Sequence, residues 1–198
     1  MDFFPEGSAK KLKEIKAEKE TMKNGEQPET KKKEGNTRMA ELINGKAVSA
    51  SKREEIKKRV AVLNEAGKQV GLAVIIVGNN SASRVYVNNK KKACEALGII
   101  SEEYALPENT TQEELLSLID ALNKKESING ILCQLPLPKH LDEEVIKEMV
   151  TEMKDVDCMG SANTAHVFAQ DGKGHAPCTP QAVIEMLRPE VEAAIANI

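Results

Sequence analysis

The side chain best placed for chemistry is a lysine on a helix that we predict over residues 81–97. This helix carries three consecutive lysines, Lys90, Lys91 and Lys92. At 100° per residue, Lys90 falls about 40° from Tyr86, inside the apolar stripe, whereas Lys91 and Lys92 fall at about 140° and 240°. A lysine that faces a core must pair, reach out to solvent or have a lowered pKa, and a desolvated lysine is a common catalytic group. The alternative interpretation of the run is a solvated lysine face.

A glutamine follows a strongly apolar segment further along the chain. The run Gly130-Ile-Leu-Cys133 leads directly into Gln134, and Pro136 and Pro138 stiffen the loop behind it. Ligands of parallel α/β sheets bind beyond the carboxyl ends of the strands, which is where Gln134 would lie. Its side chain could hydrogen-bond a ligand or a lysine without adding charge. An ordinary rigid loop is the alternative.

Carboxylates and a thiol are the other candidates. Asp155 and Asp157 are two residues apart, so in an extended segment both would face one side and could counter a lysine or accept from ring N–H groups. An Asp-rich turn is the alternative. His175 lies three residues before Cys178, which is a weak signal for a cysteine nucleophile with its base. The histidines show no metal-ligand spacing, and the sequence has neither a G-x-G-x-x-G nor a P-loop motif.

The elements that must position these residues alternate between strand and helix patterns. The segment over 71–78 is an almost continuous apolar run bounded by glycines, as in a strand buried on both faces of a parallel sheet. Strands are expected over 71–78, 99–106 and 128–133. Helices are expected over 49–66, 81–97, 111–125 and 142–153. A loop is expected over 154–178, followed by a last helix with Thr179 as its cap and Pro180 at its first position. The alternation predicts a three-layer α/β domain with a mainly parallel sheet flanked by helices.

The composition favours one such domain behind a charged tail. The chain has 198 residues, of which 40% are apolar and 30% charged, and a net charge of −3 argues against general nucleic-acid binding. Residues 1–38 hold ten Lys/Arg and eight Asp/Glu with few apolar side chains, which predicts a disordered tail before a domain that opens at Met39. Four widely spaced cysteines, no apolar membrane-spanning run and no apolar leader indicate a cytoplasmic protein without a membrane partner.

In their order along the chain, these segments resemble the bifunctional methylenetetrahydrofolate dehydrogenase/cyclohydrolase family. The resemblance is carried by Val77-Gly-Asn-Asn-Ser-Ala-Ser-Arg-Val-Tyr-Val87, Lys90-Lys-Lys-Ala-Cys-Glu95, Gly98, Gly130-Ile-Leu-Cys-Gln-Leu-Pro-Leu-Pro138, Lys154-Asp-Val-Asp157 and Pro177-Cys-Thr-Pro180. It runs from about Ile43 to Leu187 and covers the family's N-terminal, folate-binding catalytic domain. The family oxidises 5,10-methylenetetrahydrofolate with NADP, or NAD in some members, and hydrolyses the methenyl product to 10-formyltetrahydrofolate.

The resemblance implies roles for individual residues. Lys90 would activate water or stabilise the developing charge, Gln134 would hold and tune that lysine, and Asp157 would anchor the pterin; these are the implied catalytic residues. Tyr86 would stack near the folate ring. The implied folate-binding residues are Tyr86, Val87, Asn88, Asn89, Lys90, Cys133, Gln134, Leu135 and Asp157, with the backbone of Cys133 and Leu135 lining the site. No metal is implied, and no residue of this chain is assigned to the NADP cofactor.

The chain departs from the family pattern after Asp157. It continues Cys-Met-Gly-Ser161, where the family usually has Gly, an aromatic residue or Leu, and often His-Pro. Asn163 still matches the family's asparagine. The family's NADP-binding Rossmann domain and its Pro-Gly-Gly-Val-Gly loop are not found after Leu187.

We therefore expect a tail over 1–38, a catalytic domain over 39–187 and a C-terminal remnant over 188–198. Such a catalytic half would be inactive as a dehydrogenase and very weak as a cyclohydrolase, because it lacks the wall that holds the cofactor and excludes water. The family forms homodimers largely through the second domain, so a dimer does not follow for this chain. The alternative is a non-catalytic folate-binding or interaction module that acts only with a partner chain.

Overall fold

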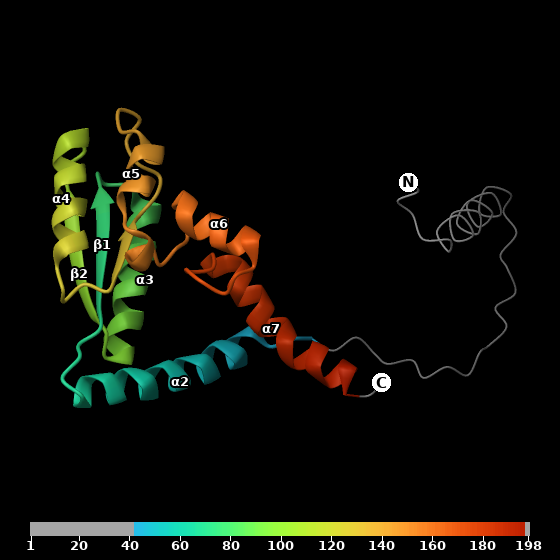
Figure 1. Cartoon of the computed structure of the whole chain (residues 1–198). Helices are drawn as coiled ribbons and strands as arrows, with labels where there is room; N and C mark the ends of the chain where they lie inside the picture. The colour runs from blue at the N-terminus through green and yellow to red at the C-terminus, as the bar shows by residue number, and fades with distance from the viewer. Residues whose placement is uncertain (1–41, 197–198) are drawn as a thin grey trace, which may run out of the picture. The chain divides into compact units, whose positions relative to one another are not determined.

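The structure, a computed structural model, describes residues 42–196, and the predicted disordered tail over 1–38 and the domain start at Met39 lie outside them. Its elements, drawn in Figure 1, are α2 (Gly45–Glu65), β1 (Gly71–Val77), α3 (Ser81–Leu97), β2 (Ile100–Leu106), α4 (Gln112–Lys124), β3 (Gly130–Cys133), α5 (Glu143–Met149), the 3-10 helix η1 (Glu152–Lys154), α6 (Ser161–Ala169) and α7 (Cys178–Ile195).

Three parallel strands form the sheet, in the order β2-β1-β3. β1 is central because it is apolar throughout and tolerates burial on both faces. Its register pairs Val77 with Leu106 in β2 and Ile75 with Cys133 in β3. The predicted α/β architecture is confirmed, so the residues that follow the three strands meet at one edge of the sheet.

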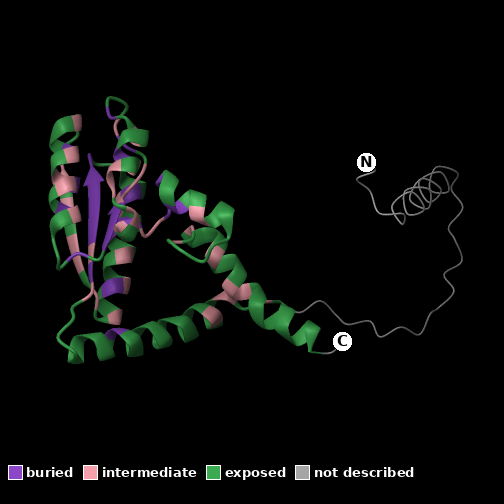
Figure 2. Cartoon of the chain, viewed as in Figure 1, coloured by how far each residue is buried: buried purple, intermediate pink, exposed green. Residues whose placement is uncertain are grey.

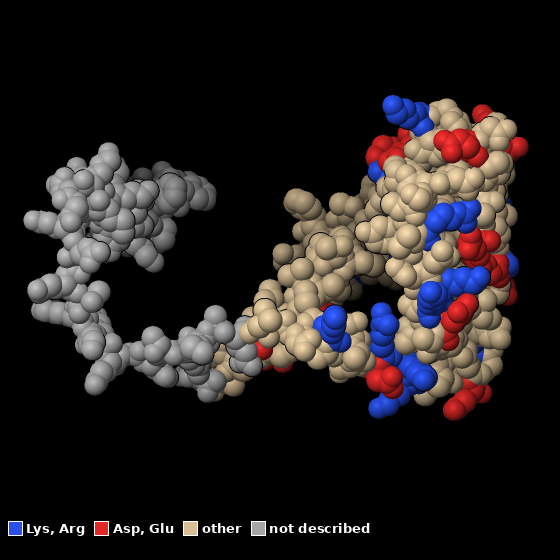
Figure 3. Space-filling view, turned by 180° about the vertical axis from the view of Figure 1, so that it is seen from behind, with Lys and Arg blue, Asp and Glu red and all other residues tan. Residues whose placement is uncertain are grey.

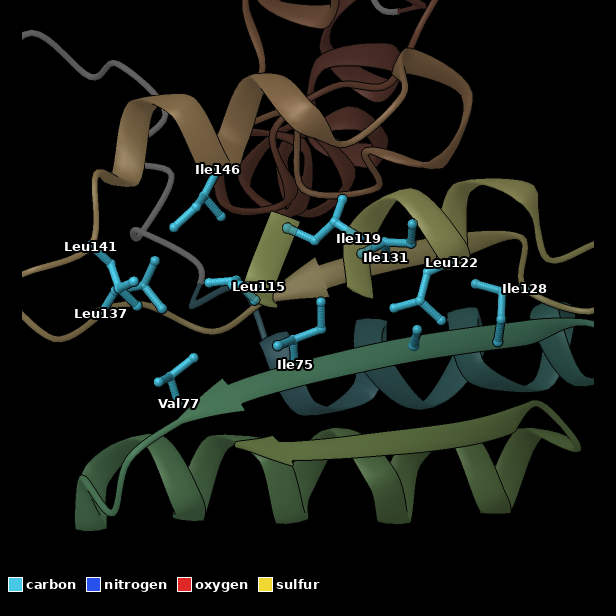
Figure 4. Packing of buried hydrophobic residues seen from close by; sticks show 11 residues of the cluster. Ile75, Val77, Leu115, Ile119, Leu122, Ile128, Ile131, Leu137, Leu141 and Ile146 are labelled. Atoms are coloured by element: carbon cyan, nitrogen blue, oxygen red, sulfur yellow. The ribbon is translucent and has the colours of Figure 1, made fainter. Parts of the chain in front are cut away.

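One face of the sheet packs against α4 and α5. The main core joins apolar side chains of these elements with the residues around β3: Ala73, Ile75, Val77, Leu115, Ile119, Leu122, Ile128, Ile131, Leu137, Leu141 and Ile146 (Figure 4). α4 begins at the predicted capping box, in which Glu114 N–H donates to Thr111 Oγ1 at 3.2 Å and Thr111 N–H donates to the Glu114 carboxylate at 2.8 Å. This helix is therefore fixed at its start by its own sequence.

The opposite face of the sheet packs against α3, which completes the three layers. A smaller core cluster there consists of Val74, Ile76, Val87 and Leu132, and Figure 2 shows the central strand β1 buried between the helices. α3 has the predicted bounds because its ends are encoded locally. Asn80 Oδ1 accepts from Ser83 N–H at 3.1 Å, and Gly98 ends the helix in the left-handed conformation at φ 77°.

α2 is longer and less buried than predicted. It begins at Gly45 rather than at residue 49, because Asn44 Oδ1 accepts from Ala47 N–H at 3.2 Å and caps it. Of its predicted apolar face only Val60 is buried, whereas Ile56 and Leu63 are 38% and 40% exposed. The apolar stripe of this helix is therefore largely uncovered in the described structure.

The last helix also begins earlier than predicted, at Cys178. The prediction of Thr179 as its cap and Pro180 as its first residue was wrong, because Pro177 takes the cap position and no side chain caps the helix. Pro180 is still within the first turn, where its missing N–H leaves no intrahelical bond unmade. α7 continues through Pro189 to Ile195, across the predicted boundary between 187 and 188.

Two predictions between residues 142 and 178 were wrong. The helix expected over 142–153 ends at Met149, where Val150 turns to extended backbone. The predicted loop over 154–178 contains α6. α6 has no apolar stripe to reveal it, because the one buried side chain it contributes is the polar Asn163.

Candidate active site

Lys90 lies on the buried side of α3, as predicted. Ser83, Val87 and Cys94 are buried on this helix and Lys90 is half-buried, whereas Lys91 and Lys92 are exposed. Tyr86 was expected inside the apolar stripe but is 60% exposed. The buried face is instead centred on Val87, which still leaves Lys90 turned toward the sheet.

Gln134 is the hydrogen-bond partner of Lys90. Lys90 Nζ donates to Gln134 Oε1 at 3.0 Å, which joins α3 to the residue that follows β3. Gln134 is held on both sides: its N–H donates to Ile75 O at 2.8 Å, and its Nε2 donates to Leu135 O at 2.8 Å. Because Nε2 is committed to Leu135, the amide oxygen must point at the lysine.

The two aspartates lie in a tight turn, which is the alternative that the sequence left open beside an extended segment. Asp155 is 4% exposed, and its carboxylate accepts from Met159 N–H, Gly160 N–H and Asn163 Nδ2, each at 3.0 Å. This carboxylate is therefore occupied by hydrogen bonds within the fold. Asp157 is half-buried.

Cys178 lies near both Asp157 and Lys90. Partial desolvation of the Cys178 thiol raises its pKa although the residue is exposed, interaction with Asp157 raises this pKa further, and the charge of Lys90 lowers it. Cys178 Sγ also donates to Val156 O at 3.5 Å, so α7 begins against the turn that carries Asp157. The structure therefore brings together a lysine, an amide, a carboxylate and a thiol from four separate segments.

The other predicted folate-binding residues are distributed around this cluster. Cys133, Leu135 and Asp157 line one small cavity, and burial raises the pKa of the Cys133 thiol to about 12. Val87 is 2% exposed in the smaller core, so its side chain is not available to a ligand. Asn88 and Asn89 are exposed on the solvent side of α3.

Some residues that build the site carry no motif signal of their own. Ser83 is 3% exposed and its hydroxyl donates to Leu135 O at 3.5 Å, across from Gln134. Asn163 is fully buried, donates to Asp155 and accepts from His175 N–H at 2.8 Å. The resemblance to the family names Asn163 without a role, and the signal for Ser83 is its place one turn before Val87.

The glycine turn before α3 has the general form of an anion-binding loop. Gly78 has φ 78°, and it leads into a helix N-terminus. A Cβ at Gly78 would lie 2.5 Å from Glu108 Oε2, so a carboxylate covers the turn. Like charges repel, so this turn does not fit the pyrophosphate of a nicotinamide dinucleotide.

On the face that Figure 3 draws, the charges do not separate by sign. In the view of Figure 3, basic and acidic side chains are interspersed over the same face. Residues 42–196 contain no group of three or more His, Cys, Asp or Glu side chains suited to a metal ion. No helix within the same range combines the length and apolar character needed to cross a membrane.

Comparisons with known proteins find one family that has both this fold and these motifs. The sequence pattern of the tetrahydrofolate dehydrogenase/cyclohydrolase catalytic domain matches residues 43–157. The chain belongs to this family. The bifunctional protein FolD of Acetivibrio thermocellus is 50% identical over 149 residues, which cover 75% of this chain and 52% of the relative. The chain thus spans about half the length of the curated relatives that it matches.

Solved structures of the family superpose on the same region. The bifunctional FolD enzyme of Campylobacter jejuni matches with a TM-score of 0.75 and 45% identity, over 76% of this chain and 53% of that one. The Trypanosoma brucei enzyme, solved with NADP cofactor and an inhibitor, matches with a TM-score of 0.72 and 35% identity, over 76% of this chain and 52% of that one. The parallel sheet and its flanking helices are therefore a dehydrogenase/cyclohydrolase catalytic domain.

Proposed function

We propose that this chain carries the folate-binding, cyclohydrolase-competent half of a methylenetetrahydrofolate dehydrogenase/cyclohydrolase. The observation that supports this function most directly is the 3.0 Å hydrogen bond between Lys90 Nζ and Gln134 Oε1 at the carboxyl edge of a parallel sheet. An amide oxygen fixes the lysine without neutralising it, so the ammonium can interact with charge that develops on a substrate.

The proposed reaction is hydrolysis of 5,10-methenyltetrahydrofolate. Water adds to the carbon between N5 and N10 of the cationic substrate and loses a proton, which leaves a hydroxyl group on this carbon. The bond from this carbon to N5 then breaks as the hydroxyl group loses its proton to become a carbonyl and N5 takes up a proton, so that one proton is released overall. The formyl group remains on N10. Lys90 would orient the attacking water and stabilise the oxygen that becomes the formyl carbonyl, while Gln134 holds its Nζ.

Asp157 would bind the pterin in this proposal. Its carboxylate is an acceptor for the ring N–H groups, and it is half-buried beside the cavity that Cys133 and Leu135 line. Tyr86 is exposed one turn before Lys90, where its ring could stack on the folate. Val87, Asn88 and Asn89 would contribute backbone or solvent-side contacts only.

The oxidative step of the family needs a nicotinamide cofactor, which accepts the hydride. NADP is our proposal for the whole enzyme, supported by the related trypanosomal structure. The turn at Gly78 does not fit its pyrophosphate, so we assign no cofactor contact to the described residues. We expect the 198-residue polypeptide alone to show no NADP-dependent oxidation.

We also propose a cytoplasmic location, which is supported by the four free cysteines in the described part of the chain.

Calorimetric titration with 5-formyltetrahydrofolate tests the proposed site. We expect the wild-type chain to bind, Asp157→Ala to lose at least about tenfold in affinity, and Asp120→Ala to bind like wild type. Asp120 is a matched control because it pairs with Lys124 on α4, away from the cluster. A folded wild type without binding would contradict the proposal, and binding without any methenyl hydrolysis would favour the non-catalytic module.

A further inference from the structure

The turn that carries Asp157 is anchored by the residue at its start. Lys154 Nζ donates to Leu122 O and to Lys125 O, both at 2.9 Å. These carbonyls belong to the last turn of α4 and the residue that caps it, and each also accepts one backbone N–H, from Lys125 and from Ile128 respectively. A cation at this end also interacts favourably with the helix dipole. Lys154 thus ties the site turn to α4.

Asn123 makes a second connection between α4 and the chain that leads to the turn. Its Nδ2 donates to Met149 O at 2.8 Å, and its Oδ1 accepts from Thr151 N–H at 3.1 Å. This contact fixes the chain before η1, but Lys154 is the last attachment to α4 before the turn itself. Burial lowers the pKa of Lys154, because desolvation disfavours its charged form.

Beyond Lys154 the turn is attached to the sheet and to α6. Asp155 bridges to Ile131 of β3, and its carboxylate is fixed by the N–H groups of Met159 and Gly160. Val156 packs on Gly130, whose added Cβ would lie 2.7 Å from Val156 Cγ1. Asp157 follows directly, so its backbone position is determined by three consecutive anchored residues.

We propose that Lys154 is a positioning residue for Asp157, acting through the turn and not on the substrate. This inference rests on the proposed function for its effect on folate. The Lys154 ammonium donates to carbonyl groups at the end of α4, so it stabilises the fold and does not contact the substrate. Removing the ammonium frees the first of the three anchors, and the carboxylate of Asp157 then samples positions that do not match the ring N–H groups.

The test combines folate affinity with backbone exchange in the full chain. Lys154→Met keeps the length of the side chain and removes the donor, and Lys154→Arg restores one. Lys124→Met is the matched control, because Lys124 lies at the same helix end but is exposed and pairs with Asp120. We expect Lys154→Met to weaken 5-formyltetrahydrofolate binding about tenfold, Lys154→Arg to recover most of it, and Lys124→Met to change it by less than about twofold.

A double-mutant cycle separates positioning from general destabilisation. If Lys154 acts through Asp157, Lys154→Met has less than about a twofold effect on affinity in an Asp157→Ala background. We also expect faster hydrogen exchange over residues 155–160 in Lys154→Met, with exchange of β1 unchanged. Equal losses of affinity in both backgrounds, or wild-type exchange over 155–160, would overturn the proposal.

The exchange measurement needs no ligand, so it also decides the case in which folate binding fails. If the wild-type chain binds no folate, the proposed function is wrong. Unchanged exchange in Lys154→Met would then overturn the anchoring as well. Faster exchange confined to 155–160 would uphold Lys154 as the anchor of the turn.

Discussion

Lys90 differs from Lys91 and Lys92 because α3 is buried along one side only. A 3.6-residue period places Lys90 one turn after Val87, which is 2% exposed, and one turn before Cys94, which is 7% exposed. The helix geometry therefore places the Lys90 ammonium at the edge of the core, where it donates a hydrogen bond to Gln134. Tyr86, one residue away from Val87, falls outside the covered face for the same reason.

Removal of the Lys90 ammonium should abolish the hydrolytic chemistry and spare the fold. We expect Lys90→Met to lower methenyltetrahydrofolate hydrolysis by at least about 100-fold or to the buffer rate, because no other described ammonium donates to Gln134. Lys91→Met is the control, since Lys91 is exposed on the same helix. Hydrolysis is measured by the loss of methenyl absorbance, and equal rates in the two variants would contradict the assignment.

The Cys133 thiol makes stability fall at high pH. Its pKa is raised from 9.0 to about 12 in the folded chain, mainly by burial. A raised pKa contributes stability that is fully present below pH 9 and is lost as the pH rises toward 12. Between pH 8 and pH 10 we expect the free energy of unfolding to fall by up to about 1.4 kcal/mol more in wild type than in Cys133→Ala. Urea titrations at both pH values measure this difference, and parallel pH slopes would refute it.

At the scale of elements, the site depends on how β3 and the following turn fit together. Gly130 has no side chain, and Val156 occupies the space where a Cβ would stand. Leu72 of β1 closes the other side at 3.2 Å. A glycine is therefore required in this strand because another chain segment approaches it closely.

Gly130→Ala should move the turn and weaken the site. We expect a loss of about 1–3 kcal/mol in the free energy of unfolding, because the added methyl group overpacks a closed contact. Val156→Ala in the same chain should recover part of this loss by making room. Thermal unfolding of the two single variants and the double variant measures the coupling. Strictly additive losses would show that the contact is unimportant.

Elements with local signals could be predicted from the sequence, and the rest could not. The capping box of Thr111 and the terminal Gly98 are local, so α4 and α3 were found within a residue of their bounds. α6 is held by Asn163 and Asp155, a polar contact over eight residues that produces no apolar period. The Lys90–Gln134 pair spans 44 residues, so residue patterns could name its two members, but only the resemblance to the family implied that they pair.

At the scale of the whole molecule, the described part divides into a well-packed sheet and a thinly packed pair of helices. α7 has no buried residue. Its exposed apolar residues are Val183, Ile184, Leu187, Val191 and Ile195. A groove of about 450 Å³ runs between α2 and α7, and one ion pair, Lys52–Glu185 at 2.8 Å, crosses it. Exposed ion pairs contribute little stability.

α7 should therefore open long before the sheet unfolds. We expect amide hydrogens over residues 182–195 to exchange at least about 100-fold faster than those of β1, because local opening exposes few buried contacts there. Native-state hydrogen exchange resolves both segments in one experiment. Protection of α7 equal to that of β1 would mean that the helix is held by contacts that the described residues do not make.

The exposure of Tyr86 also gives the chain an optical signal of its own. The chain has no tryptophan and two tyrosines, so its ultraviolet emission comes from Tyr86 and Tyr104. The Tyr104 hydroxyl donates a hydrogen bond to the Glu102 carboxylate at 2.5 Å. A phenol that is hydrogen-bonded to a carboxylate fluoresces weakly. Emission therefore reports mainly on Tyr86, one helical turn from Lys90. A molecule that stacks on this ring will change the fluorescence of the unlabelled protein.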